Sequence, residues 1–162
     1  DPDTTCEVTS VGPSERVWAA CGLEITASSV RPALDKFDVL VIPGGPGTRA
    51  LVSDEDVVRW IDSFPHNRLV ATVCTGSLLL GAAGRLRDVR ATTHHRVKDA
   101  LAAYGARVVE RRVVDELQIV TAAGVTAGIE LGLHIVRRLT DDVVETAIAT
   151  QMEHHSAQQR MP

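Results

Sequence analysis

The sequence predicts an α/β fold, a three-layer α/β/α sandwich whose sheet is mostly parallel. Two observations support this prediction. The chain alternates short apolar runs with stretches of helical pattern, as βαβ units do. Its core must also be aliphatic, because aromatic residues make up only 3% of the 162 residues while hydrophobic residues make up 44%. Val, Leu, Ile and Ala suit a buried parallel sheet that helices cover.

The first quarter of the chain predicts strands separated by turns. Alternating or continuous apolar runs indicate a short strand, then a hairpin that turns near Cys21 and Gly22, then a buried strand. These predicted strands span residues 6–11, 17–18, 23–27 and 37–42. The last of them ends at the sequence Pro-Gly-Gly-Pro-Gly, residues 43–47. We therefore expect a loop directly after that strand.

The middle of the chain predicts two helices around a central strand. Ser53 and three acidic residues form a helix start, because acidic side chains stabilise the positive end of a helix. Pro65 ends this helix, and the apolar run 69–73 predicts the next buried strand. A Leu- and Ala-rich helix then follows Cys74 and stops at Gly84.

The last part of the chain predicts a mixture of strands and helices. Asp115 and Glu116 are expected to form the turn between two antiparallel strands, and residues 140–142 to cap the final helix. The predicted strands are residues 91–93, 108–114 and 117–121, and the predicted helices are 97–103, 126–139 and a last one that runs past Ile148. No internal repeat or linker interrupts the sequence.

Cys74 stands where the predicted strand 69–73 meets the following helix. A residue at such a junction is held in a tight turn that presents its side chain outward. The backbone amides of Thr75 and Gly76 begin the helix, point toward the same place and favour an anion. They therefore favour the thiolate, which is the nucleophilic form of cysteine. The alternative is a cysteine buried at a strand end, and the flanking sequence favours the nucleophile.

The glycine-rich loop 43–47 also follows a predicted strand directly. Because the carboxyl ends of adjacent parallel strands meet at one edge of a sheet, this loop and Cys74 are expected to lie together. Gly44 and Gly45 let backbone amides approach a ligand closely. The N–H groups of Gly45 and Thr75 would then form a hole for an oxyanion or a polarised carbon–heteroatom group. The alternative is an ordinary Gly/Pro turn.

The charge and cysteine content exclude several classes of function. The formal net charge of −4 gives no basic field for a phosphate backbone, so nucleic-acid binding by this segment is not expected. Three cysteines do not form a disulfide framework, and they fit the reducing cytoplasm. No apolar run reaches the roughly 20 residues of a membrane helix.

We predict no metal site and no cofactor. The pairs His94–His95 and His154–His155 are direct neighbours, and neighbouring side chains on a helix do not face one another. No spacing typical of zinc ligands supports them. Glu130, on an otherwise apolar helix, is expected to pair with backbone amides or with His134 one turn away.

Several motifs together resemble the ThiJ/PfpI superfamily, a branch of the class I glutamine amidotransferase-like fold. These motifs are VIPGGPGTRAL, VCTGSLLLGAAGRLRDVRATTHH and VTAAGVTAGIEL. The likeness extends from about Thr5 to Glu145. Within the superfamily the motifs look closest to isonitrile hydratases and to the amidase-like sensor domains of AraC-type regulators.

The resemblance implies a flavodoxin-like fold with a nucleophile elbow, in which Cys74 is the nucleophile. It makes Gly45 and Thr75 backbone donors at the thiol, with Gly44 beside them, and it places His94 as either a wall of the site or a structural residue. It also implies a homodimer that acts on a small molecule without a cofactor.

One departure from the family concerns the N-terminus. The family begins with a strand and a helix that supply an acidic residue to the thiol, and no residue near Asp1 matches that motif. We therefore expect one domain over residues 1–162 that lacks this first unit, with the acid upstream of Asp1. Hydration of an isonitrile to an N-substituted formamide is the leading hypothesis. The alternatives are a glyoxalase- or deglycase-like hydrolase, a sensor domain of an AraC-type regulator, and a redox sensor in which Cys74 is oxidised.

Overall fold

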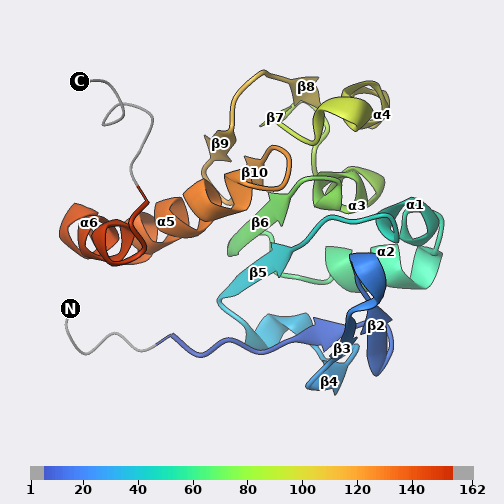
Figure 1. The fold of residues 1–162 in the computed structure, drawn as a ribbon. Coiled ribbons are helices and arrows are strands. Elements are labelled where there is room, and N and C mark those ends of the chain that lie inside the picture. Colours follow the sequence, from blue (N-terminus) through green and yellow to red (C-terminus); the bar gives the residue numbers. More distant parts are fainter. Residues whose placement is uncertain (1–5, 155–162) are drawn as a thin grey trace.

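A computed structural model describes residues 6–154 and confirms the predicted α/β architecture. Its centre is a four-stranded sheet in the order β5 (Val39–Ile42), β6 (Leu69–Val73), β10 (Ile119–Ala122) and β9 (Val113–Glu116). The first three strands are parallel, while β9 runs antiparallel to β10. Figure 1 shows this sheet at the middle of the molecule.

Helices cover both faces of the sheet and give three layers (Figure 1). On one face α2 (Glu55–Asp62) and α3 (Gly76–Ala82) pack over Val70 of β6. On the other face α5 (Ala127–Leu139) packs over Ala71 and Val120. This alternation follows from the strand geometry, since successive side chains of β6 point to opposite faces and both faces are apolar.

The remaining elements surround this central unit. The helices are α1 (Thr48–Leu51), α4 (Lys98–Ala103) and α6 (Asp142–Gln151), with short 3-10 turns η1 (Ala20–Gly22), η2 (Leu34–Lys36) and η3 (His95–Val97). The strands form three pairs: β1 (Val11–Gly12) with β4 (Ser29–Val30), β2 (Arg16–Trp18) with β3 (Glu24–Thr26), and β7 (Arg90–Ala91) with β8 (Arg107–Val108). Helix α6 packs on α5. Among the helices described, none is both long and apolar enough to span a bilayer.

Two predicted strands were wrong in extent. The predicted strand 6–11 is regular only from Val11, because residues 6–10 are exposed and, of these, only Ser10 has a hydrogen-bond partner in the described structure, Ser28 next to β4. The predicted strand 108–114 is two strands, β8 and β9, which belong to different sheets. The antiparallel pair that follows is confirmed, but its turn lies at residues 117–118, where Leu117 has φ +60°. Asp115 and Glu116 remain in the strand.

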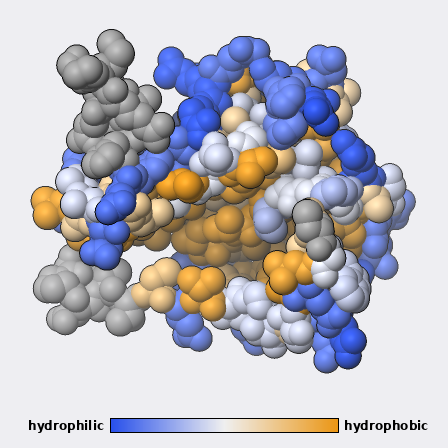
Figure 2. All heavy atoms as spheres, in the orientation of Figure 1, coloured by the Kyte–Doolittle hydropathy of each residue, from blue (hydrophilic) through white to orange (hydrophobic). Residues whose placement is uncertain are grey.

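One side of the central sheet is open among the described residues. There β5 is the outer strand, and Val41 is 50% exposed although the strand is apolar. Figure 2 shows an apolar hollow in this part of the molecule. The expectation that the chain lacks the first strand and helix of its family stays a prediction, and β5 is the edge at which such a strand would pair.

Candidate functional site

Cys74 occupies a strained elbow between β6 and α3. Its φ angle of +58° lies in the left-handed region, which residues other than glycine rarely adopt. The Cys74 N–H donates to the carbonyls of Ala122 and Ala123 at the end of β10, with distances of 3.0 and 3.1 Å. Cys74 is half-buried and forms no disulfide. The sharp turn expected from the sequence is therefore present.

The glycine-rich loop packs directly on this elbow, as the meeting of strand ends predicts. A Cβ atom on Gly44 would lie 2.8 Å from the Cys74 Cβ and 2.7 Å from the Thr75 nitrogen, so no side chain fits there. Gly45 has φ +153°, a conformation that favours glycine. The loop is thus built for close backbone contact with the elbow.

The two predicted backbone donors, the N–H groups of Gly45 and Thr75, differ in their hydrogen bonding. The Gly45 N–H donates to Thr75 Oγ1 at 2.9 Å, and the Thr75 hydroxyl donates back to the Gly45 carbonyl at 3.1 Å. No hydrogen bond engages the Thr75 N–H within residues 6–154. Of these two amides, that of Thr75 is therefore the one without a partner among the described residues, while the Gly45 amide would have to exchange its present partner to bind a ligand.

His94 lies beside the elbow at the end of the segment that begins with β7. The Thr93 hydroxyl, one residue earlier, donates to the Cys74 carbonyl at 2.8 Å. The His94 ring stacks against His95 with centroids 4.3 Å apart, and a Cβ on Gly124 would meet it at 2.7 Å. The structure thus brings His94 to the same edge of the sheet as Cys74.

The surroundings of His94 favour its neutral form. Its Nδ1 accepts a hydrogen bond from the Arg96 N–H at 3.3 Å. Desolvation lowers the pKa of His94 below 6.5, and the neighbouring charges of His95, Arg96 and Arg49 lower this pKa further. His94 is therefore uncharged near neutral pH, with a proton left on Nε2 to donate.

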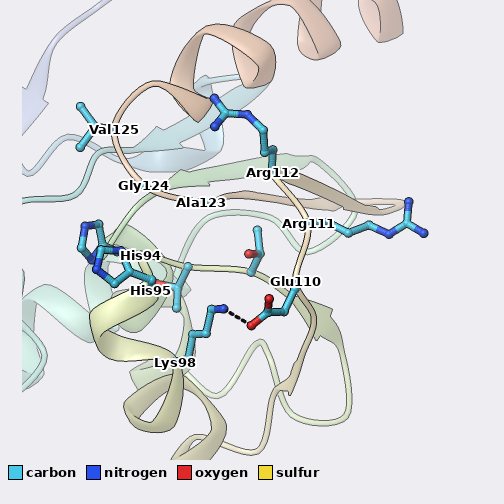
Figure 3. A pocket seen from close by; sticks show the side chains of 11 residues that line it. His94, His95, Lys98, Glu110, Arg111, Arg112, Ala123, Gly124 and Val125 are labelled. Carbon is cyan, nitrogen blue, oxygen red and sulfur yellow. Dashed lines mark hydrogen bonds and ion pairs between the residues drawn. The ribbon is translucent and has the colours of Figure 1, made fainter. Parts of the chain in front are cut away.

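A cavity of about 440 Å³ opens next to His94. Figure 3 shows His94 and His95 on one side of it and the loop of Gly124 above them. Lys98 crosses its floor to pair with Glu110. Thr93 and Ala123 line this cavity, and both contact the backbone of Cys74. The cavity is therefore separated from Cys74 by the residues that contact its backbone.

The comparison with protein families gives the family of the chain. The sequence profile of the DJ-1/PfpI family matches residues 3–138. The chain belongs to the DJ-1/PfpI family. The predicted membership of the ThiJ/PfpI superfamily is confirmed by this match and by the solved structures that share the fold.

This DJ-1/PfpI chain is similar to proteins of several kinds. An isonitrile hydratase of Pseudomonas putida is 38% identical over 138 residues, which are 85% of this chain and 60% of that protein. An HTH-type transcriptional regulator of Pseudomonas aeruginosa is 27% identical over 154 residues, covering 91% of this chain and 42% of the regulator. The crystal structure of a ThiJ/PfpI family protein from Pseudomonas syringae matches with a TM-score of 0.85 and 35% identity, over 93% of this chain and 64% of that one. The chain thus spans less than two thirds of each relative.

The hydrogen-bond partners of Glu130 and His134 differ from those that the sequence predicted. Glu130 pairs with Arg112 through two hydrogen bonds of 2.8 and 2.9 Å, and not with His134. His134 instead contacts Asp115 at 2.6 Å. The error arose because Arg112 lies 18 residues before Glu130, and helical spacing reveals only neighbours on the same helix. No group of three metal-binding side chains occurs in the part of the chain that the structure describes.

Sequence reasoning also missed Thr93. This buried residue, 1% exposed, was treated as part of a strand, yet its hydroxyl contacts the Cys74 backbone. The adjacent Thr92 is equally buried, and its N–H donates to the Thr121 hydroxyl at 2.9 Å. The available signal was a pair of threonines directly before a candidate site histidine.

Proposed function

We propose that this chain is the cysteine-bearing domain of an isonitrile hydratase-type enzyme. The observation that supports it most directly is the half-buried Cys74 at φ +58°, followed by the Thr75 amide, which has no hydrogen-bond partner among residues 6–154. The 38% identity to an isonitrile hydratase supports the choice of reaction. Because the chain covers 60% of that relative, the activity of the whole protein belongs to the proposal.

The reaction begins with addition of the Cys74 sulfur to the terminal carbon of the isonitrile. A C–S bond forms, the same carbon takes up a proton, and the product is a thioimidate. Water then adds to this carbon and the nitrogen gains a proton. Cleavage of the C–S bond releases the N-substituted formamide and restores the sulfur, so one water is consumed per turnover.

The residues around Cys74 have separate roles in this scheme. The Thr75 N–H is the backbone donor for negative charge that develops next to the sulfur. Helix α3 has only seven residues, so we assign this role to the single amide and not to a helix dipole. His94 forms the wall toward the cavity of Figure 3. The acidic residue expected upstream of Asp1 would handle the proton transfers.

The test uses full-length protein and a simple alkyl isonitrile, with formamide followed by NMR. We expect Cys74→Ala to lower kcat/KM by roughly 10³-fold or more, because loss of a nucleophile leaves only binding. Cys6→Ser is the matched control, since Cys6 is a free exposed cysteine, and its activity should equal that of the wild type. Hydration that survives in Cys74→Ala would refute the proposal.

A glyoxalase- or deglycase-like hydrolase would use the same sulfur on a different electrophile. Because both reactions would need Cys74, the Cys74→Ala variant does not distinguish them. Parallel assays of the wild type with methylglyoxal and with an isonitrile do. Faster consumption of methylglyoxal by the wild type would transfer the assignment to this alternative.

A ligand-sensing domain of an AraC-type regulator is the second candidate. The match to 91% of this chain by an HTH-type regulator favours it. The sequence of the complete gene discriminates, because a helix-turn-helix segment after Pro162 would favour the regulator. Within this candidate Cys74→Ala would leave transcriptional control intact.

The homodimer and the cytoplasmic location stay predictions of the resemblance and the cysteine content. Sedimentation of the full-length protein measures the first, and cell fractionation measures the second.

A further inference from the structure

Two buried hydroxyl groups donate to the carbonyl of Cys74. Thr93 Oγ1 lies 2.8 Å from this oxygen and Ser77 Oγ lies 3.1 Å from it. Both residues are nearly inaccessible, at 1% and 0% exposure. A residue in the left-handed region persists only where its surroundings fix it, because that conformation is unfavourable. These bonds therefore help to explain how the elbow is maintained.

The two hydroxyls differ in what they connect. Ser77 is three residues after Cys74 and belongs to the first turn of α3, so it moves with the elbow. Thr93 comes from a separate segment 19 residues along the chain. That segment is anchored to the central sheet, since the Thr92 N–H donates to Thr121 of β10. Of the two hydroxyl groups, only that of Thr93 therefore ties the Cys74 carbonyl to a separate segment of the chain.

The same short segment also carries His94. Thr93 precedes it directly, so the bond from Thr93 to Cys74 attaches the segment that carries the imidazole to the backbone of the elbow. On its other side the His94 ring contacts Gly124, where an added Cβ would lie 2.7 Å from the ring and displace it. One hydroxyl thus acts on two groups of the candidate site.

We propose that Thr93 is a positioning residue: its hydroxyl donates to the Cys74 carbonyl, holds Cys74 in the left-handed conformation that presents the sulfur, and fixes the segment that carries His94 to the elbow. The effect that we expect on turnover rests on the proposed function. The reactivity of Cys74 toward a small alkylating reagent reports the positioning without any substrate.

Thr72, in the strand β6 that leads into Cys74, provides a matched control. Its hydroxyl is fully buried and has no hydrogen-bond partner among the described residues. Replacing it with valine keeps the shape and removes a polar group that contributes no bond, which is neutral or stabilising. Thr72→Val should therefore leave the elbow as it is.

The experiment compares Thr93→Val, Thr93→Ser and Thr72→Val in the full-length protein. Iodoacetamide alkylation of Cys74 is followed by peptide mass spectrometry, with exposed Cys6 as internal reference. We expect Thr93→Val to slow Cys74 alkylation about tenfold, the factor that loss of one ordinary hydrogen bond corresponds to. Thr93→Ser should react within about twofold of the wild type, as should Thr72→Val. In turnover, Thr93→Val should lower kcat with KM little changed.

The outcomes separate this inference from the proposed function. Wild-type alkylation rates in Thr93→Val would overturn the positioning role, whatever the protein does to isonitriles. A slowed Cys74 in a protein that never hydrates an isonitrile would uphold positioning and refute the function. If Thr93→Val does not fold, Thr93→Ala and Thr93→Ser replace it, because they differ by the hydroxyl alone, and equal rates in that pair would overturn the inference.

Discussion

The elbow at Cys74 and the β2–β3 hairpin are stabilised in opposite ways. At the elbow an unfavourable backbone conformation is fixed by hydrogen bonds at both peptide groups of Cys74 and by contact with Gly44. The hairpin has an ordinary extended backbone, and all six of its paired residues are exposed. One ion pair, Arg16–Glu24 at 3.4 Å, joins its strands. The strained backbone of Cys74 thus lies in a densely bonded part of the fold, whereas no paired residue of the hairpin has a positive φ angle.

The largest effect is expected from Gly76→Ala in the elbow. A Cβ there would lie 2.3 Å from the Ile42 carbonyl oxygen and 2.9 Å from that of Pro43. Both contacts are with backbone, so relief requires movement of β5 itself. Overpacking of this kind costs about 3 kcal/mol, and urea unfolding measures it.

Gly132→Ala is the matched control for this substitution. Gly132 lies on α5, where an added Cβ meets nothing within 4 Å. Because alanine favours helix, the free energy of unfolding should rise by up to about 1 kcal/mol. If both variants were equally stable, the dense packing ascribed to the elbow would be wrong.

The local features of the elbow could be predicted from the sequence. An apolar run, then Cys-Thr-Gly-Ser, then an apolar helix specifies a strand-to-helix junction through neighbouring residues alone. The Gly44–Gly45 loop could be placed beside it, because parallel strands end at a common edge. The bond from Thr93 to Cys74 could not be predicted, because it joins residues 19 positions apart that share no periodicity.

The strand errors have the same origin. Residues 6–10 were predicted as a strand, but a strand needs a partner along its length and in the described structure only Ser10 has one, Ser28. In the predicted strand 108–114 the break comes where Arg112 turns to bond Glu130 and Thr126 of another segment. Tertiary contacts therefore decided where these strands begin and end.

An intermediate effect is expected for Glu130→Gln, and it should depend on pH. The hydrogen bond from Arg112 is the main cause that lowers the pKa of Glu130 below its ordinary 4.5. A lowered carboxyl pKa stabilises the fold above the unfolded value and loses this contribution as pH falls through the folded one. Because the two side chains are 55% and 33% exposed, the contribution at pH 7 should stay below about 1 kcal/mol.

Urea unfolding between pH 7 and pH 3 measures the contribution of the Arg112–Glu130 pair, as the difference in the free energy of unfolding between the wild type and Glu130→Gln. The difference should shrink toward zero at the acid end. In an Arg112→Gln background the same substitution should show little pH dependence, since the partner that lowers the pKa is gone. A difference that is constant over this pH range would contradict the assignment.

The smallest effect is expected from Trp18→Ser in the hairpin. Trp18 is 66% exposed, so its removal returns little apolar surface to water and creates no cavity. Such substitutions change the free energy of unfolding by about 0.5 kcal/mol or less, and the alkylation rate of Cys74 should equal that of the wild type. A loss above about 1 kcal/mol would mean that the hairpin buries this ring against another surface in the full-length protein. The contrast between a densely packed elbow and a loosely held hairpin would then apply only to residues 1–162 taken alone.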